Sequence, residues 1–305
     1  HKVGRSGKTH MAQHVLPSLP GDLVTVSPLP RNRPSAKRLI LSVLSQPNLY
    51  ETHIGQLIRW GGLFNHAPAT IRVTAGRLTK QGLLDSIDRG IYRIAKAGEA
   101  LQKTAAAWTS ILDRIGEWDG QWLCIHTAHL GRSDKTAIRG RERAFRLMGL
   151  EQLISGLWCR PANLTEQASE SLHRLIALGL EPDAVLLHMK DSNLCASVDP
   201  FSLWRRDRLE ARYREMIDLL EASQLRLEQL DMASAMRESF LVGEHVIRQI
   251  NADPLLPEEM IDASLREQMV AKMQSYDAYC HPLWVLFRDY SAEHDGSKPF
   301  SNAKM

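Results

Sequence analysis

One stretch, residues 68–94, constrains the fold of this 305-residue chain more than any other. Ile71, Ala75 and Leu78 fall at i, i+4 and i+7, which is the spacing of one buried face of an α-helix. Gly82 follows directly and is typical of the left-handed residue that ends a helix. A helix is therefore predicted between the proline that opens the stretch and this glycine.

A ribbon is predicted to follow the helix. Residues 83–87 and 91–94 alternate apolar and polar side chains around Asp88-Arg89-Gly90, which is a hairpin signal. The rest of the helix circumference is polar and basic, and such a face fits the DNA major groove. The alternative is a surface helix with a solvated basic face. The predicted DNA contacts are Thr70, Arg72, Val73, Arg77, Lys80 and Arg89.

Two short helices precede this stretch. Residues 35–44 read as an amphipathic helix with Ser35 as its cap, and residues 52–60 read as a second helix closed by two glycines. Three helices followed by a ribbon form the order of a winged helix-turn-helix, which we place at residues 35–96. Residues 1–34 read as a tag remnant before Met11 and a proline-containing extended arm.

The charge of the chain is uneven along its length. Residues 1–115 carry 16 Lys+Arg and 6 Asp+Glu, so +10, and the remaining 22 and 29 give −7. A basic front on an acidic rear fits a nucleic-acid module joined to a regulatory or oligomerising body. The alternative is chance drift in surface charge. No run of 18 apolar residues predicts a membrane span, and four scattered cysteines favour buried thiols in a reducing, cytoplasmic setting.

The remaining residues divide into three parts, so the predicted class is α+β. Residues 97–116 read as a connector helix that pairs with its copy in a dimer or packs against its own winged domain. Residues 117–198 follow the order β-α-β-β-α-β of a ferredoxin-like domain. Residues 199–290 are predicted to be all helical, with long helices at 201–230 and 232–250 and two more at 257–273 and 275–287, and 291–305 form a polar tail.

The sequence lacks the residue patterns that are typical of enzyme active sites, which argues against an enzyme. His126 and His129 stand three apart at a strand end, where such residues point to opposite faces, so no metal site is predicted. The motifs of serine hydrolases, zinc peptidases and phosphate-binding loops are absent from the sequence. The arginines between Arg139 and Arg146 could bind an acidic ligand or DNA, but a solvated helix face is the simpler interpretation. No catalytic residue and no cofactor is therefore predicted.

Four stretches resemble the PaaX family of phenylacetic-acid degradation repressors. They are TIRVTAGRLTKQGLL with RGIYRIAKAG, EWDGQWLCI, MGLEQLISGLWCRP and ADPLLPEEM, and together they span about residues 35–290. The resemblance implies a winged helix, a ferredoxin-like middle domain and a helical C-terminal domain. It also implies a homodimeric repressor that binds double-stranded operator DNA with inverted half-sites and is released by an aryl-acyl-CoA such as phenylacetyl-CoA. At Val73 to Gly76 small residues replace the family's bulkier ones, which leaves the operator sequence open.

A CoA thioester carries several phosphate charges, so its site needs cations beside an apolar slot. Cationic clusters stand out in the acidic rear of the chain, and two are candidates, although ordinary surface charge is the plainer reading. Their residues are Trp204, Arg205 and Arg208 in the first, and His245 and Arg248 in the second.

Two other classes of protein compete with the repressor. An RNA-processing or nuclease-like protein would use the ferredoxin-like domain, but such nucleases usually need a carboxylate at the end of the first strand, where His126-Thr127 stands. A scaffold with a vestigial winged helix would not need basic residues on the exposed side of its third helix.

Overall fold

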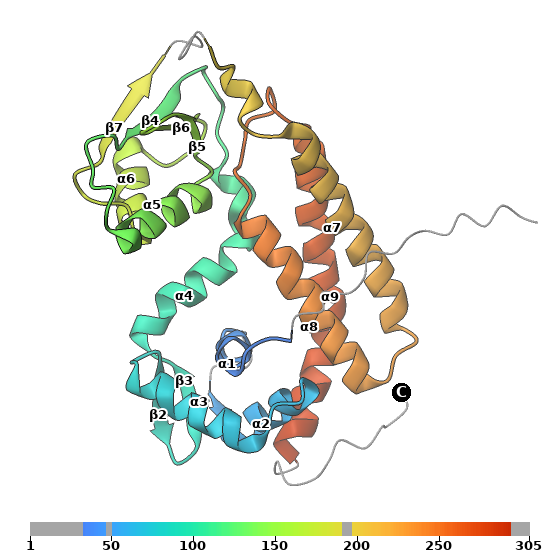
Figure 1. The fold of residues 1–305 in the computed structure, drawn as a ribbon. Helices are drawn as coiled ribbons and strands as arrows, with labels where there is room; N and C mark the ends of the chain where they lie inside the picture. Colours follow the sequence, from blue (N-terminus) through green and yellow to red (C-terminus); the bar gives the residue numbers. More distant parts are fainter. Residues whose placement is uncertain (1–32, 47–50, 191–196, 294–305) are drawn as a thin grey trace, which may run out of the picture.

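A computed structural model describes residues 33–46, 51–190 and 197–293 and has the expected α+β class (Figure 1). The predicted tag remnant and arm (1–34) lie outside the described residues up to residue 32, and the predicted polar tail (291–305) lies outside them beyond residue 293. No helix in the described part is both long and apolar enough to span a membrane.

The first part is the expected three helices and ribbon. The helix predicted at the start of the chain is capped as expected, since the Ser35 hydroxyl accepts from the backbone N–H of Arg38. The second helix begins two residues later than predicted, because Thr52 and His53 pair with the ribbon as a short strand. The elements are α1 (Ala36–Leu44), β1 (Thr52–His53), α2 (Ile54–Leu63), α3 (Pro68–Lys80), β2 (Leu84–Asp88) and β3 (Ile91–Ile94), with strand order β1-β3-β2.

The connector is not the single helix that was predicted. It consists of α4 (Lys96–Ala106) and a 3₁₀ helix, η1 (Ala107–Arg114), with non-helical dihedral angles at Ser110. The first half packs against the winged domain, where Gly98 lies so close to Leu83 that a Cβ would stand 2.6 Å from its carbonyl oxygen. In the second half, Trp108 and Ile111 are buried in a core shared with the C-terminal helices. Because of the kink, the connector packs against the winged domain with its first half and against the C-terminal helices with its second half.

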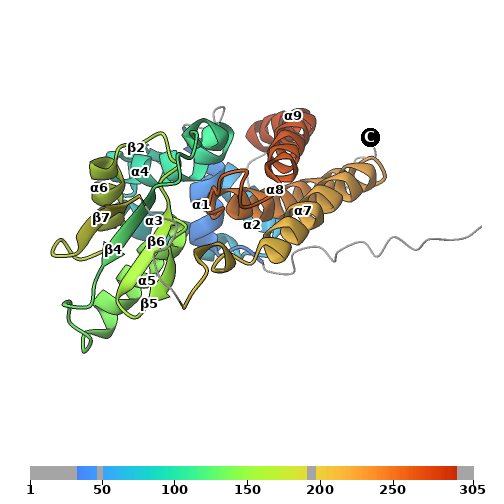
Figure 2. The same ribbon diagram turned by 90° about the horizontal axis from the view of Figure 1, so that it is seen from above.

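The middle domain has the predicted β-α-β-β-α-β order. Its antiparallel sheet runs β5-β6-β4-β7, and a core formed by one face of the sheet packs against the two helices. The opposite face joins the core of the C-terminal helices, and seen from above the two domains lie side by side (Figure 2). The elements are β4 (Trp122–His126), α5 (Lys135–Leu147), β5 (Glu151–Ile154), β6 (Leu157–Pro161), α6 (Ala168–Leu178) and β7 (Val185–Met189).

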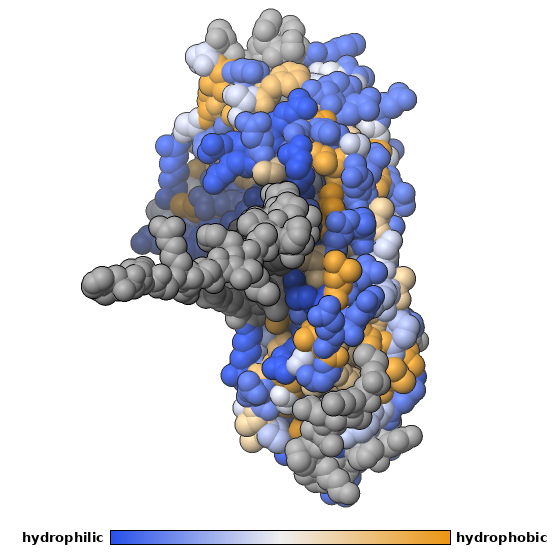
Figure 3. All heavy atoms as spheres, turned by 90° about the vertical axis from the view of Figure 1, so that its right-hand side faces the viewer, coloured by the Kyte–Doolittle hydropathy of each residue, from blue (hydrophilic) through white to orange (hydrophobic). Residues whose placement is uncertain are grey.

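The C-terminal domain is helical, but its boundaries differ from the prediction. It contains η2 (Pro200–Ser202), α7 (Arg206–Leu227), α8 (Met232–Asn251) and α9 (Ala263–Glu293). The two helices expected at 257–273 and 275–287 are one continuous helix, which begins later and contains Pro282. Residues 258–261 form a turn and a bend instead of helix, and the Asp262 carboxylate accepts from the backbone N–H of Ser264 where α9 begins. On the side of the molecule at the right of Figure 1, apolar residues are interspersed among hydrophilic ones (Figure 3).

The winged domain and the C-terminal helices share one continuous core. Trp60 of α2 lies 5.0 Å from Trp284 and 4.8 Å from Phe287 of α9, measured between ring centroids. Phe64 lies 5.2 Å from Phe240 of α8. Aromatic pairs at these separations add to the gain from burying their surface. The orientation of the winged domain is therefore set by α8 and α9.

Candidate nucleic-acid interface

The two sides of α3 differ sharply. Ile71, Ala75 and Leu78 are fully buried against α1 and α2, as their spacing predicts. Val73, on the opposite side, is 71% exposed. All six predicted DNA contacts, Thr70, Arg72, Val73, Arg77, Lys80 and Arg89, are exposed. The structure thus places the five helix residues on one accessible surface.

The cations of this surface keep their charge available. Among the ion pairs formed by the described residues, none involves Arg72, Arg77, Lys80 or Arg89. A cation that has no acidic neighbour within the protein can pair with a phosphate without first giving up a partner. Arg93 on β3 is a further exposed cation, but it pairs with Asp85 at 3.5 Å. The alternation of apolar and polar residues in this strand did not predict the ion pair of Arg93 with Asp85.

The tip of the ribbon is held against the start of α2. Gly90 has a positive φ of 77°, and its carbonyl accepts from the backbone N–H of Ile54 at 2.7 Å. The Asp88 carboxylate accepts from the backbone N–H of Arg89 at 2.6 Å. The Arg89 side chain therefore projects from a turn that is fixed relative to the helices.

The turn before α3 is anchored by Arg33, which sequence reasoning missed. Its guanidinium donates to the carbonyl of Asn65 at 2.6 Å and lies 2.9 Å from Nδ1 of His66. Asn65 has a positive φ of 57°, so the contact stabilises a strained turn. A tertiary contact across 32 residues leaves no local sequence signal.

Three of the four stretches quoted above meet where the middle domain joins the C-terminal helices. Trp204 donates from Nε1 to the carbonyl of Gly149 at 3.1 Å and stacks at 6.1 Å from Trp122. Gly149 has a positive φ and lies against Pro254, where a Cβ would stand 2.7 Å from the proline Cα. These residues act as a structural junction.

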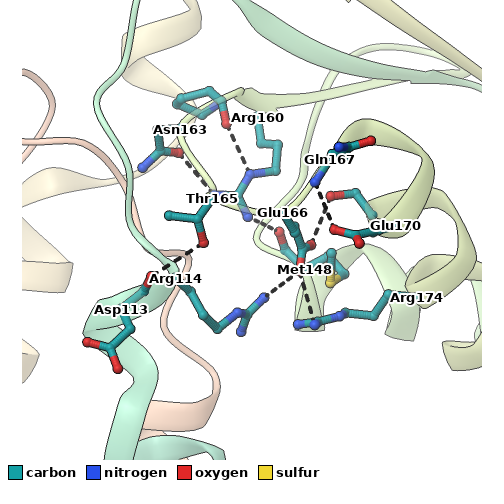
Figure 4. Close-up of polar contacts among 12 residues, drawn as sticks. Asp113, Arg114, Met148, Arg160, Asn163, Thr165, Glu166, Gln167, Glu170 and Arg174 are labelled. Atoms are coloured by element: carbon teal, nitrogen blue, oxygen red, sulfur yellow. Dashed lines mark hydrogen bonds and ion pairs between the residues drawn. The ribbon is translucent and has the colours of Figure 1, made fainter.

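A buried arginine lies at the centre of this junction (Figure 4). Arg160 donates to the carbonyl of Pro161 at 3.1 Å, to that of Met148 at a short distance, and to the side chain of Asn163 at 3.2 Å. Asn163 in turn donates to the carbonyl of Leu255 at 2.8 Å. Burial lowers the pKa of Arg160 to about 10, so it stays charged at neutral pH. With its donors engaged by the protein, this cation is better suited to holding the domains together than to binding a ligand.

Beside it, Glu166 collects a second set of polar contacts (Figure 4). Its carboxylate lies 3.0 Å from Arg174 and 3.7 Å from Arg114, and it accepts from the Ser171 hydroxyl at 2.8 Å. Burial, followed by the charge of Arg174, lowers the pKa of Arg114. The contact ties the end of η1 to α6.

The two predicted ligand clusters lie in different places. Trp204 is buried in the junction, with Arg205 and Arg208 exposed beside it. His245 and Arg248 lie on α8 near Arg38 of α1, which is ion-paired with Glu244. The cluster of Trp204, Arg205 and Arg208 therefore lies where the middle domain meets the C-terminal helices. The cluster of His245 and Arg248 lies where the winged domain meets them.

Two arginines of α5 serve the middle domain itself. Arg141 is ion-paired with Glu181, and Arg143 donates to the carbonyl of Leu178 at 2.8 Å. Arg139 and Arg146 are exposed.

The prediction that His126 and His129 point to opposite faces is wrong. The strand ends at His126 and the chain turns, so the two rings face each other with Nδ1 atoms 3.3 Å apart. Alternation applies only while the chain stays extended.

Comparison with known proteins supports the fold. No family model matches the chain, and no curated protein matches it. It is similar to a solved structure described as the uncharacterized protein Rv0674 from Mycobacterium tuberculosis, with 22% sequence identity and a TM-score of 0.58. The match covers 85% of this chain and 99% of that one.

Proposed function

We propose that this protein is a cytoplasmic, homodimeric transcriptional repressor that binds operator DNA through α3 and the β2–β3 ribbon. The observation that carries the proposal is the exposed face of α3, where Arg72, Arg77 and Lys80 have no acidic partner among the described ion pairs. A helix presented in this way fits the major groove, and its arginines can reach guanine edges or phosphates. No catalytic residue or cofactor is part of the proposal.

The regulated genes and the effector are proposed from the resemblance to the PaaX family. On that basis the operon encodes aromatic-compound catabolism of the phenylacetate type, and the effector is an aryl-acyl-CoA. The effector would bind better to a conformation whose winged domains are wrongly spaced for inverted half-sites, so DNA affinity falls by that differential affinity alone.

Substitution of Arg77 tests direct DNA contact. Selection from randomised duplexes would first supply the preferred sequence. Arg77→Ala should then cost about 1–3 kcal/mol of binding free energy in an anisotropy titration, because a side chain that reaches a base edge is lost. Arg237→Ala, which removes an exposed arginine from α8, is the matched control and should bind like the wild type. Unchanged affinity of the Arg77 variant would refute the contact.

Arg89 should behave differently from Arg77. Because it projects from the ribbon tip, Arg89→Ala should weaken binding to all sequences and lower the slope of log K against log salt by about one. A loss confined to the preferred sequence would show that Arg89 reads bases instead.

An RNA-processing or nuclease-like protein remains the alternative function. It would need a carboxylate at the end of the first strand of the middle domain, and β4 ends at His126 with Thr127 after it. Neither residue supplies a carboxylate.

A further inference from the structure

Two histidines meet at one end of the middle-domain sheet. His126 is the last residue of β4 and is partly buried, while His129 stands exposed on the turn that follows. Their ring planes are inclined by only 17°, their centroids are 5.2 Å apart, and their Nδ1 atoms are 3.3 Å apart. Neither residue has a role in the proposed DNA binding.

The tautomer of His129 is fixed by its surroundings. Its Nε2 lies 2.8 Å from the carbonyl oxygen of Asp183, which can only accept, so Nε2 carries the proton. The Nδ1 of a neutral His129 is then a lone pair directed at His126. Metal-binding histidines are commonly held in this way, with the second ring N–H donated to a backbone carbonyl.

The separation of the two nitrogens suits two ligands of one metal ion. Nitrogens bound at about 2.0–2.1 Å to a tetrahedral Zn²⁺ stand roughly 3.3 Å apart, and their ring centroids roughly 5 Å apart. Both measured separations agree with two nitrogens that converge on one ion. With no ion bound, the same pair can form an N–H···N hydrogen bond in which Nδ1 of His126 donates to Nδ1 of His129, and this holds the two nitrogens together.

We propose that His126 and His129 bind a transition-metal ion such as Zn²⁺ through their Nδ1 atoms. Among the described residues no group of three or more His, Cys, Asp or Glu is arranged to hold a metal, so water completes the coordination. Such a site is open and exchangeable. Imidazole ligands select Zn²⁺, Ni²⁺ and Cu²⁺ over Mg²⁺ and Ca²⁺, which prefer oxygen.

Zinc titration of the full chain tests the site, with ZnCl₂ as the only added ligand. The chain has 12 histidines, so the measurement is the difference between variants. Calorimetry should show that His129→Ala lacks one Zn²⁺ equivalent that the wild type binds. The loss of Zn²⁺ affinity should exceed about 10–100-fold, which is the cost of removing a residue that only hydrogen-bonds to a metal ligand. His173→Ala, an exposed histidine of α6, is the matched control and should keep that equivalent.

Long-range ¹H–¹⁵N spectra of the histidine rings locate the ion. Zn²⁺ should shift the Nδ1 resonances of His126 and His129 and leave the protonated Nε2 of His129 in place. His126→Asn, checked for folding by circular dichroism, should abolish the shift at His129. Equal stoichiometry in the wild type and His129→Ala, or shifts confined to other histidines, would overturn the site. DNA binding is not part of either readout, so the result stands apart from the proposed function.

Discussion

At the scale of single residues, two glycines of the middle domain share a backbone conformation but differ in surroundings. Gly120 has a φ of 83° with no atom within 4 Å of a Cβ added to it, and Gly149 has a φ of 68° with the Pro254 backbone at 2.7 Å. Gly120→Ala should destabilise the protein by about 1–2 kcal/mol, the cost of a left-handed residue with a Cβ. Gly149→Ala should cost clearly more, because the backbone of Pro254 must also move. Thermal unfolding of both variants measures the difference, and equal losses would contradict the close approach.

The EWDGQWLCI stretch shows which residue-scale features a sequence reveals. Trp118 donates from Nε1 to the carbonyl of Gln121 at 2.6 Å, and Asp119 accepts from both the backbone and the side chain of Gln121. These contacts lie within four residues, so the turn could be predicted from the local sequence. The role of Arg160 was not recognisable, because its partner Asn163 is held in place by the carbonyl of Leu255, 92 residues away.

At the scale of elements, local signals placed the helices and tertiary packing decided their ends. The buried side of α3 followed from the spacing of Ile71, Ala75 and Leu78, and so did its exposed face. The bend at Ser110 did not follow, because it arises from contacts with two different domains. The split predicted near Gln274 was wrong for a similar reason, since α7 contacts α9 at Lys272 and at Tyr276, one on each side of that position. The His126–His129 pair was considered as a metal site but dismissed, because the strand was assumed to continue.

The contact between α1 and α8 contains a histidine with an altered pKa. Burial, and after it the charge of Arg248, lowers the pKa of His245 below 6.5, with Arg38 acting in the same direction and Glu215 opposing both. The ion pair of Arg38 with Glu244 lies beside it. Protonation would therefore add a third cation where two arginines already stand.

This lowered pKa predicts acid sensitivity. As pH falls through 6.5, the unfolded chain takes up a proton that the folded protein resists, so stability is lost until the pH reaches the lowered folded-state pKa. His245→Gln should remove this contribution and flatten the dependence of melting temperature on pH between about pH 7.5 and about pH 5.5. His188→Gln, which alters an exposed histidine of β7, serves as the control. An unchanged slope in the His245 variant would mean that the histidine titrates normally.

At the scale of the whole molecule, the shared cores restrict how a signal could reach the DNA. The winged domain shares its core with α8 and α9 through Trp60, Phe240 and Phe287, and the other end of the helical domain joins the middle domain at Trp204. The helical domain thus contacts both of the other parts. An effector bound at either contact would change the packing of the helices that orient α3.

The last prediction concerns the proposed effector. An aryl-acyl-CoA should raise the melting temperature and release operator DNA, while the free aryl acid should do neither, because it lacks the phosphates that cationic side chains would bind. By linkage, operator DNA must weaken the affinity for the CoA thioester by the same factor, typically about 5–150-fold. Calorimetric titration of the thioester with and without saturating operator measures that factor.

Arg248→Ala and Arg205→Ala, one from each predicted cluster, would show which contact binds the thioester. Equal thioester affinity in both titrations would rule out release by this mechanism, and release by the free acid would show that the CoA moiety is not required.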